Sequence, residues 1–120
     1  MSWDASFDGD SWNYTHNTNE MVAAAMTDAG LGEPPPIQDP FFAPVIRNSW
    51  WKRLDGMSGR EGAEFVGAII RALEADPAKF REMNPANGWG SYDGILAVLR
   101  KMKAHSDGAC CDVRKWHTNG

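Results

Sequence analysis

Apolar residues recur at helical spacing in three stretches of the chain. In each stretch they occupy positions i, i+3, i+4 and i+7, which places them along one face of an α-helix. The pattern predicts helices at about residues 18–29, at about residues 59–75, and from Ser91 to the turn signal Asp107-Gly108. The positions are Val22, Ala25, Met26 and Ala29, then Val66, Ile69, Ile70 and Leu73, and finally Ile95, Val98, Leu99 and Met102.

Polar residues at the predicted helix starts support these boundaries. The segment Ser58-Gly59-Arg60-Glu61 has the signature of a capping box, and segment 17–20 resembles one, with asparagine first and glutamate last. Asp76-Pro77 predicts a further short helix through Met83, because aspartate caps a helix and proline suits its first position.

Two short segments at the N-terminus have a strand-like composition instead. Aromatic residues alternate with polar ones in segments 3–7 and 11–15, and Asp8-Gly9-Asp10 between them is a turn signal. We therefore predict a β-hairpin. Segment 110–117 has a β-compatible alternation and is expected to pair with it. The predicted fold class is α+β, with a small antiparallel sheet, made of the hairpin and this C-terminal strand, packed against about three helices.

Five prolines exclude regular helix from residues 31–47. The segment is too apolar for a free linker, so we expect a loop that wraps across the domain and buries its large side chains; the alternative is a proline-rich ligand for a partner's aromatic groove. The apolar residues are Ile37, Phe41, Phe42, Val45 and Ile46.

Trp50 and Trp51 follow this segment directly. Because neighbouring side chains point in different directions, we expect at least one of the two to be exposed or to form the wall of a pocket.

The composition fits one soluble domain spanning residues 1–120. Hydrophobic residues make up 42% and charged residues 23% of the chain, as in ordinary folded proteins. No apolar run approaches the roughly 18 residues of a membrane span, and the N-terminus lacks the pattern of a secretory signal. The adjacent Cys110 and Cys111 cannot form a framework of loop-closing disulfides, which favours a reducing compartment. We expect a cytoplasmic protein without a membrane partner.

The net charge of −4 is divided unevenly along the chain. Residues 1–46 carry seven acids and no lysine or arginine, whereas residues 47–120 carry all 12 bases and nine acids. This asymmetry predicts attraction between the two halves within one fold, or an acidic surface that meets a basic partner. A sequence pI near 5.2 and the lack of a nucleic-acid-binding motif argue against a nucleic-acid partner.

The loop between the last two helical stretches has the composition of a binding loop. Segment 84–92 combines glycines, asparagines, a proline, a tryptophan and a tyrosine. Tryptophan and tyrosine offer stacking surfaces, asparagine amides offer paired donors and acceptors, and glycine allows close approach of the backbone. Helix starts after Asn17 and Ser91 would favour an anion. We predict a ligand-binding site made of Tyr14, His16, Asn17, Asn87, Trp89 and Tyr92; the alternative is that these are ordinary turn and cap residues.

Metal binding and catalysis have weaker sequence support. Zinc ligands are usually separated by two to four residues, so the adjacent Cys110 and Cys111 fit one metal poorly, although His105, Asp112 and His117 lie nearby. No metal is therefore assigned.

His16 near a carboxylate such as Asp10 or Asp93 is a catalytic hypothesis, but no motif of a known hydrolase or nucleotide-binding loop occurs. We assign no catalytic residues and no cofactor, and enzymatic activity stays open.

Two segments resemble a family. Asn13-Tyr14-Thr15-His16-Asn17 and Asn84-Pro85-Ala86-Asn87-Gly88-Trp89-Gly90-Ser91-Tyr92 are similar to the N-Y-T-x-N and N-P-x-N-G-W-G-x-Y segments of small uncharacterised proteins from actinobacteria and their phages. The family has no established activity to carry over to this chain, so the resemblance implies only a phage or mobile-element setting inside a host cell.

Together these observations predict a small phage-type binding protein that interferes with a host process. In one mechanism the predicted site sequesters a small polar, nucleotide-like ligand. In the second, exposed tryptophans and the acidic half bind and inhibit a host protein. A third alternative is a metal-dependent hydrolase that uses Cys111 and His117. The sequence leaves open whether the protein forms a homo-oligomer.

Overall fold

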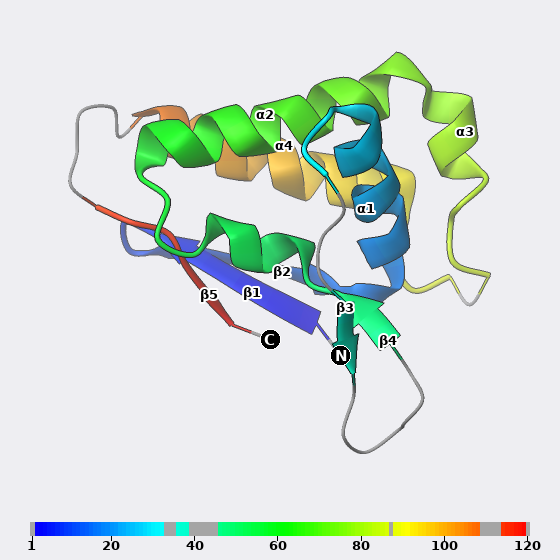
Figure 1. Ribbon diagram of the computed structural model, residues 1–120, viewed down its shortest axis with the longest axis horizontal. Coiled ribbons are helices and arrows are strands. Elements are labelled where there is room, and N and C mark those ends of the chain that lie inside the picture. Colours follow the sequence, from blue (N-terminus) through cyan, green and yellow to red (C-terminus); the bar gives the residue numbers. More distant parts are fainter. Residues whose placement is uncertain (1, 33–35, 39–45, 87, 109–113, 120) are drawn as a thin grey trace.

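The computed structural model describes residues 2–32, 36–38, 46–86, 88–108 and 114–119. Helices pack over one face of a three-stranded antiparallel sheet with strand order β2-β1-β5 (Figure 1). The predicted α+β class is confirmed, as is the sheet made of an N-terminal hairpin and a C-terminal strand. No described helix is both long enough and apolar enough to cross a bilayer.

The hairpin joins β1 (Ser2–Phe7) to β2 (Asp10–Thr15) in six consecutive residue pairs. Its two-residue turn has positive φ at both positions, 52° at Asp8 and 85° at Gly9, which is the pairing that a tight hairpin needs. Trp3, Ala5 and Phe7 are buried on one face of β1, and the residues between them lie on the outer face. Period-two patterning therefore orients the sheet on the core.

The C-terminal strand lies later in the chain than the alternation predicted. β5 (His117–Asn119) pairs with β1 and begins where the predicted strand 110–117 ends. Ser58 and Lys115 form an isolated bridge just before it. Residues 109–113, which include both cysteines, lie outside the described part of the chain.

The two long helices form the second layer. α2 (Gly59–Ala75) starts at the predicted residue, and both halves of the Ser58/Glu61 capping box are present. Hydrogen bonds from Ser58, chiefly from its backbone N–H, lower the pKa of Glu61. α4 (Tyr92–Gly108) continues through the predicted turn at Asp107-Gly108. Lys103 pairs with Asp107 one turn later at 2.7 Å, an i,i+4 contact that suits a helix rather than a turn.

The shorter helices follow the predicted order with different boundaries. α1 (Asn19–Asp28) is preceded by a 3-10 turn, η1 (His16–Thr18). Asn17 therefore lies inside this turn and does not form the predicted cap of α1. α3 (Pro77–Arg81) is capped by Asp76 as predicted, and it ends two residues before Met83.

The proline-rich segment contains a small hairpin of its own. β3 (Pro36–Gln38) pairs with β4 (Ile46–Asn48), so the described backbone of the segment is extended and not helical, which agrees with the exclusion of regular helix by the prolines. The predicted burial of Phe41, Phe42 and Val45 concerns residues outside the described part of the chain, and that of Ile37 and Ile46 concerns side chains that are likewise not described.

The prediction for the tryptophan pair was wrong, because Trp50 and Trp51 are both fully buried. They lie in a 3-10 helix, η2 (Trp50–Leu54), which contacts α1 as well as β1 and β5. The Trp50 ring packs edge-on against Trp3 at 4.9 Å, whereas the Trp51 ring packs against His16, also at 4.9 Å. A short helix that lies between two layers can bury side chains on opposite faces. The prediction had assumed that only one face would be covered.

Trp116 joins the end of the chain to the helices. Its indole Nε1 donates to Ser106 Oγ at 3.0 Å, and the Ser106 hydroxyl in turn donates to the carbonyl of Gly59 at the start of α2. Both side chains are fully buried. A Cβ at Gly62 would collide with the Trp116 ring, so this glycine leaves the space that the indole fills.

The two oppositely charged halves attract each other within the fold. Lys79 pairs with Asp28 at 2.6 Å, and Arg114 pairs with Asp8. Exposed pairs of this kind contribute only about 0–1 kcal/mol each. These ion pairs nevertheless engage two of the acidic residues that were expected to meet a basic partner.

We expect Gly62→Ala to lower the free energy of unfolding by about 1–3 kcal/mol, because the added methyl displaces the Trp116 ring and its hydrogen bond. Urea unfolding followed by tryptophan fluorescence measures the change. Gly108→Ala is the matched control, since a Cβ there meets nothing within 4 Å. Equal stability of the two variants would contradict this role of Trp116.

Candidate functional site

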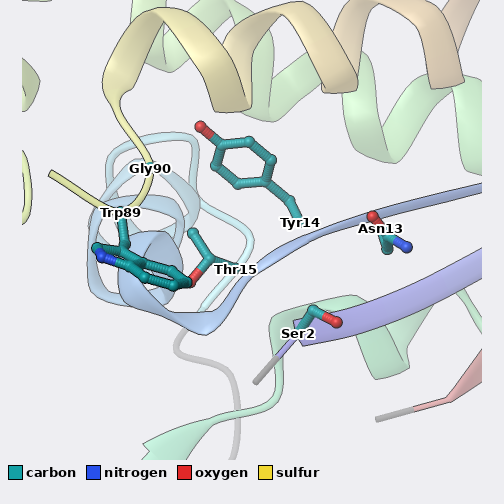
Figure 2. Close-up of a pocket in the computed structure, with 6 residues that line it drawn as sticks. All are labelled: Ser2, Asn13, Tyr14, Thr15, Trp89 and Gly90. Atoms are coloured by element: carbon teal, nitrogen blue, oxygen red, sulfur yellow. The ribbon is translucent and has the colours of Figure 1, made fainter.

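A hollow of about 360 Å³ lies where the end of β2 meets the loop before α4. Figure 2 shows Trp89 and Thr15 at one end, Tyr14 rising toward the start of α4, and Asn13 and Ser2 at the other end. The lining residues are Ser2, Asn13, Tyr14, Thr15, Trp89 and Gly90. Strand β2 and the Trp89 loop, about 75 residues apart in the chain, therefore meet here, as the sequence predicted for Tyr14 and Trp89.

Tyr14 holds the Trp89 loop against the sheet. Its hydroxyl accepts a hydrogen bond from the backbone N–H of Ser91 at 3.0 Å. A Cβ at Gly94 would collide with the same hydroxyl, and Gly90 has φ of 99°, a conformation that other residues rarely adopt. The glycines near Trp89 thus allow the helix start and the strand end to approach closely.

Trp89 is fixed through its backbone and exposed through its side chain. Asn17 Nδ2 donates to the Trp89 carbonyl at 3.2 Å, across 72 residues. The Trp89 residue is 71% exposed, and no other large hydrophobic residue in the described part of the chain is exposed. A fixed backbone that carries a largely exposed indole is suited to binding, since the backbone loses little freedom when a partner covers the ring.

His16 serves the core rather than the hollow. Its Nδ1 lies 2.9 Å from Asn19 Nδ2, and Asn19 Oδ1 accepts the indole N–H of Trp50 at 3.2 Å. Because the Asn19 oxygen already accepts, its amide nitrogen donates, which makes His16 Nδ1 an acceptor. The predicted histidine therefore joins a chain of contacts that leads to a buried tryptophan.

The carboxylates proposed as catalytic partners of His16 lie beside other groups. Asp10 Oδ2 is 3.4 Å from the Nε2 atom of His105. Asp93 pairs with Arg81 at 3.1 Å.

Tyr92, also predicted as a ligand residue, points into the core. It is 2% exposed, and its hydroxyl donates to the carbonyl of Leu73 at 2.8 Å. That carbonyl lies four residues before Pro77, which has no N–H to offer it. Tyr92 thus completes the end of α2, and it does not line the hollow. Asn87, the remaining predicted residue, lies outside the described part of the chain.

Side-chain acceptors already occupy three of the N–H groups at the start of α4 that would hold an anion. Ser91 N–H donates to Tyr14, Tyr92 N–H donates to Asn84 Oδ1 at 2.8 Å, and Gly94 N–H donates to Ser91 Oγ at 3.0 Å. The described residues that line the hollow include no lysine or arginine. The predicted phosphate-type site at this helix start thus has three of its donors in use.

The residues considered for metal binding are only partly described. His105 packs against Phe7 and Trp12, with ring separations of 6.0 and 5.2 Å, and His117 lies in β5. Within residues 2–32, 36–38, 46–86, 88–108 and 114–119, no three histidine, cysteine or acidic side chains gather as metal ligands would. Cys110, Cys111 and Asp112 lie outside those ranges.

Four lining residues were not predicted from the sequence, namely Ser2, Asn13, Thr15 and Gly90. Asn13 and Thr15 alternate along β2, and Ser2 pairs with Thr15, so all three share the outer face of the sheet. The register of the hairpin is the sequence signal that could have identified these three strand residues. The chain matches no known protein-family model, no curated protein and no solved structure.

We expect Tyr92→Phe to reduce the free energy of unfolding by about 1–3 kcal/mol at neutral pH, because the buried Leu73 carbonyl loses its donor. Burial raises the pKa of Tyr92 above its ordinary value of 10.0. The unfolded chain then releases this proton at lower pH than the folded chain, so the stability that the neutral phenol supplies is present below pH 10 and is lost as pH rises above it.

Urea unfolding of both proteins at pH 7, 9 and about 10.5 to 11 tests this expectation. The difference in stability between them should shrink at the most alkaline pH. A difference that stays constant or grows there would contradict the burial of a neutral phenol.

Proposed function

We propose that the protein binds a host protein through the face that carries Trp89 and thereby interferes with a host process. The exposure of Trp89 is the observation that carries the proposal. A tryptophan placed in solvent on a backbone tied down by Asn17 and Tyr14 resembles the anchor residues that dominate protein interfaces. The resemblance to proteins of actinobacteria and their phages supports a setting in the cytoplasm of a host cell.

Charge contributes less to this binding than the acidic half of the sequence suggested. Asp8 and Asp28 have internal basic partners, and Asp10 lies near His105. Reversing the charge of these residues would disturb the fold as well as any partner. Asp4 is exposed on the outer face of β1, so it is better placed to meet a partner. We therefore assign the affinity chiefly to the indole and a smaller electrostatic part to Asp4.

A second candidate is the capture of a small planar ligand. The hollow, about 360 Å³, falls within the ~300–1,000 Å³ range of small-molecule sites. Trp89 offers a stacking surface, and Asn13 offers an amide. Because three of the helix N–H groups are in use and the described lining residues include no base, the ligand on this reading is neutral and nucleoside-like rather than a phosphate ester.

We expect Trp89→Ala to change the free energy of unfolding by less than about 0.5 kcal/mol, because the side chain is mostly in solvent. The same change should weaken binding to a host protein by about thirtyfold or more, the effect of losing an anchor residue. Affinity capture from an actinobacterial lysate with the unchanged protein and the variant identifies the partner, and calorimetry on the purified pair measures the loss.

Lys101→Ala on α4 is a control for removal of an exposed side chain elsewhere. Equal affinity of the unchanged protein and Trp89→Ala would refute the role of the indole. Native mass spectrometry separates the second candidate, since a bound small molecule gives a mass excess that disappears on denaturation.

A further inference from the structure

One edge of β2 pairs with no other strand in the described part of the chain. Because the hairpin turn has two residues, Phe7 and Asp10 on either side of it form a hydrogen-bonded pair. In an antiparallel pair of strands every second residue bonds to the partner strand, so Trp12 and Tyr14 also bond to β1. The N–H and C=O groups of the residues between them, Ser11 and Asn13, point away from β1. Both residues are exposed, and no described residue bonds to these outward groups.

The opposite edge of the sheet is protected. β5 has only three residues, and the Thr118 N–H donates to Asp55 Oδ1 at 3.0 Å. β2 has six residues in unbroken register, without a bulge, and residues 11–15 contain no proline and no charged side chain. Proteins usually protect a free edge with lysine, proline, a bulge or a short strand, so an edge that has none of these can accept another strand.

The open edge continues into the hollow beside Trp89. Asn13 and Thr15 both line the hollow, and Figure 2 shows Trp89 beyond Thr15 at the end of the strand. A strand placed along Ser11 to Asn13 would carry its backbone along their outward N–H and C=O groups, whereas the Thr15 carbonyl already accepts from the Thr18 hydroxyl at 3.3 Å. One of its side chains would then reach the indole.

We propose that an extended segment of the partner protein adds to β2 as a fourth strand and inserts an apolar side chain into the hollow against Trp89. This inference rests on the proposed function and specifies the mode of binding. Backbone hydrogen bonds supply affinity in such complexes, and the side-chain pocket supplies selectivity.

Charge defines the segment further. The described lining residues of the hollow are uncharged, and the charged residue of β2 itself is Asp10 at its start, whereas Asp4 lies one strand further away on β1. Like charges across neighbouring strands repel each other. The segment is therefore neutral or basic beside its apolar residue and does not carry acids there.

Proline substitution tests the backbone contact directly. Asn13→Pro removes the outward N–H and leaves the bonds from Trp12 and Tyr14 to β1 in place, which is where a strand tolerates proline. Asn13→Ala is the matched control, since it removes the side chain and keeps the N–H. The probe is a displayed library of random linear nonapeptides selected on the unchanged protein.

We expect the selected peptides to be enriched in apolar residues and poor in acids, and to lose about tenfold or more in affinity for Asn13→Pro. They should lose clearly less affinity for Asn13→Ala than for Asn13→Pro, because alanine changes the lining of the hollow but keeps the backbone N–H. Equal affinity for the unchanged protein and both variants would overturn strand addition, and so would an equal loss for the two variants. Failure to select any peptide would count against the inference as well.

Amide exchange keeps the test decisive if Asn13→Pro does not fold, as judged by near-ultraviolet circular dichroism. Adding a selected peptide to the unchanged protein should protect the amides of Ser11 and Asn13 and leave those of Trp12 and Tyr14 nearly as they were. No new protection would overturn the inference.

Two further outcomes separate this inference from the proposed function. Peptides that need Trp89 but tolerate Asn13→Pro would leave the Trp89 surface standing and refute the fourth strand. A dimer of the free protein that Asn13→Pro dissociates would show that a second copy, rather than a foreign segment, pairs with β2.

Discussion

The hydrogen bond from the Ser91 N–H to the Tyr14 hydroxyl is the contact on which the candidate site depends. It joins the end of an N-terminal strand to the start of the last helix and fits only because Gly94 leaves room for the phenol. Asn17 then holds the Trp89 carbonyl from the neighbouring turn. Two polar side chains near the N-terminus thus place an exposed indole beside the open edge of β2.

Trp89 differs from most of the other tryptophans in its exposure, and this difference marks the surface around it as a candidate binding surface. Trp3, Trp50, Trp51 and Trp116 are fully buried and tie the sheet, η2 and the helices into one core, whereas Trp89 is 71% exposed. A chain that buries so many large rings has a rigid scaffold, and rigidity reduces the entropy lost when a partner covers the exposed one. The hollow, the edge and the indole act as one surface on that scaffold.

Local signals predicted most of the fold and only part of the site. The Ser58/Glu61 box, Asp76-Pro77 and the Asp8-Gly9 turn each determine their structure through neighbouring residues, and all three were predicted. Long-range contacts decided the rest. Tyr92 and Trp89 have similar local settings, yet Tyr92 is buried, and its hydroxyl donates to the Leu73 carbonyl, to which Pro77 can offer no N–H. The burial of both Trp50 and Trp51 depends on elements that are remote in the sequence.

Amide hydrogen exchange along β2 in the free protein, resolved by residue, is the most direct test that this surface is an open strand edge. The account predicts alternation, with slow exchange at Trp12 and Tyr14, which bond to β1, and fast exchange at Ser11 and Asn13, which face outward. Slow exchange at all four residues would contradict it, because the edge would then already be covered.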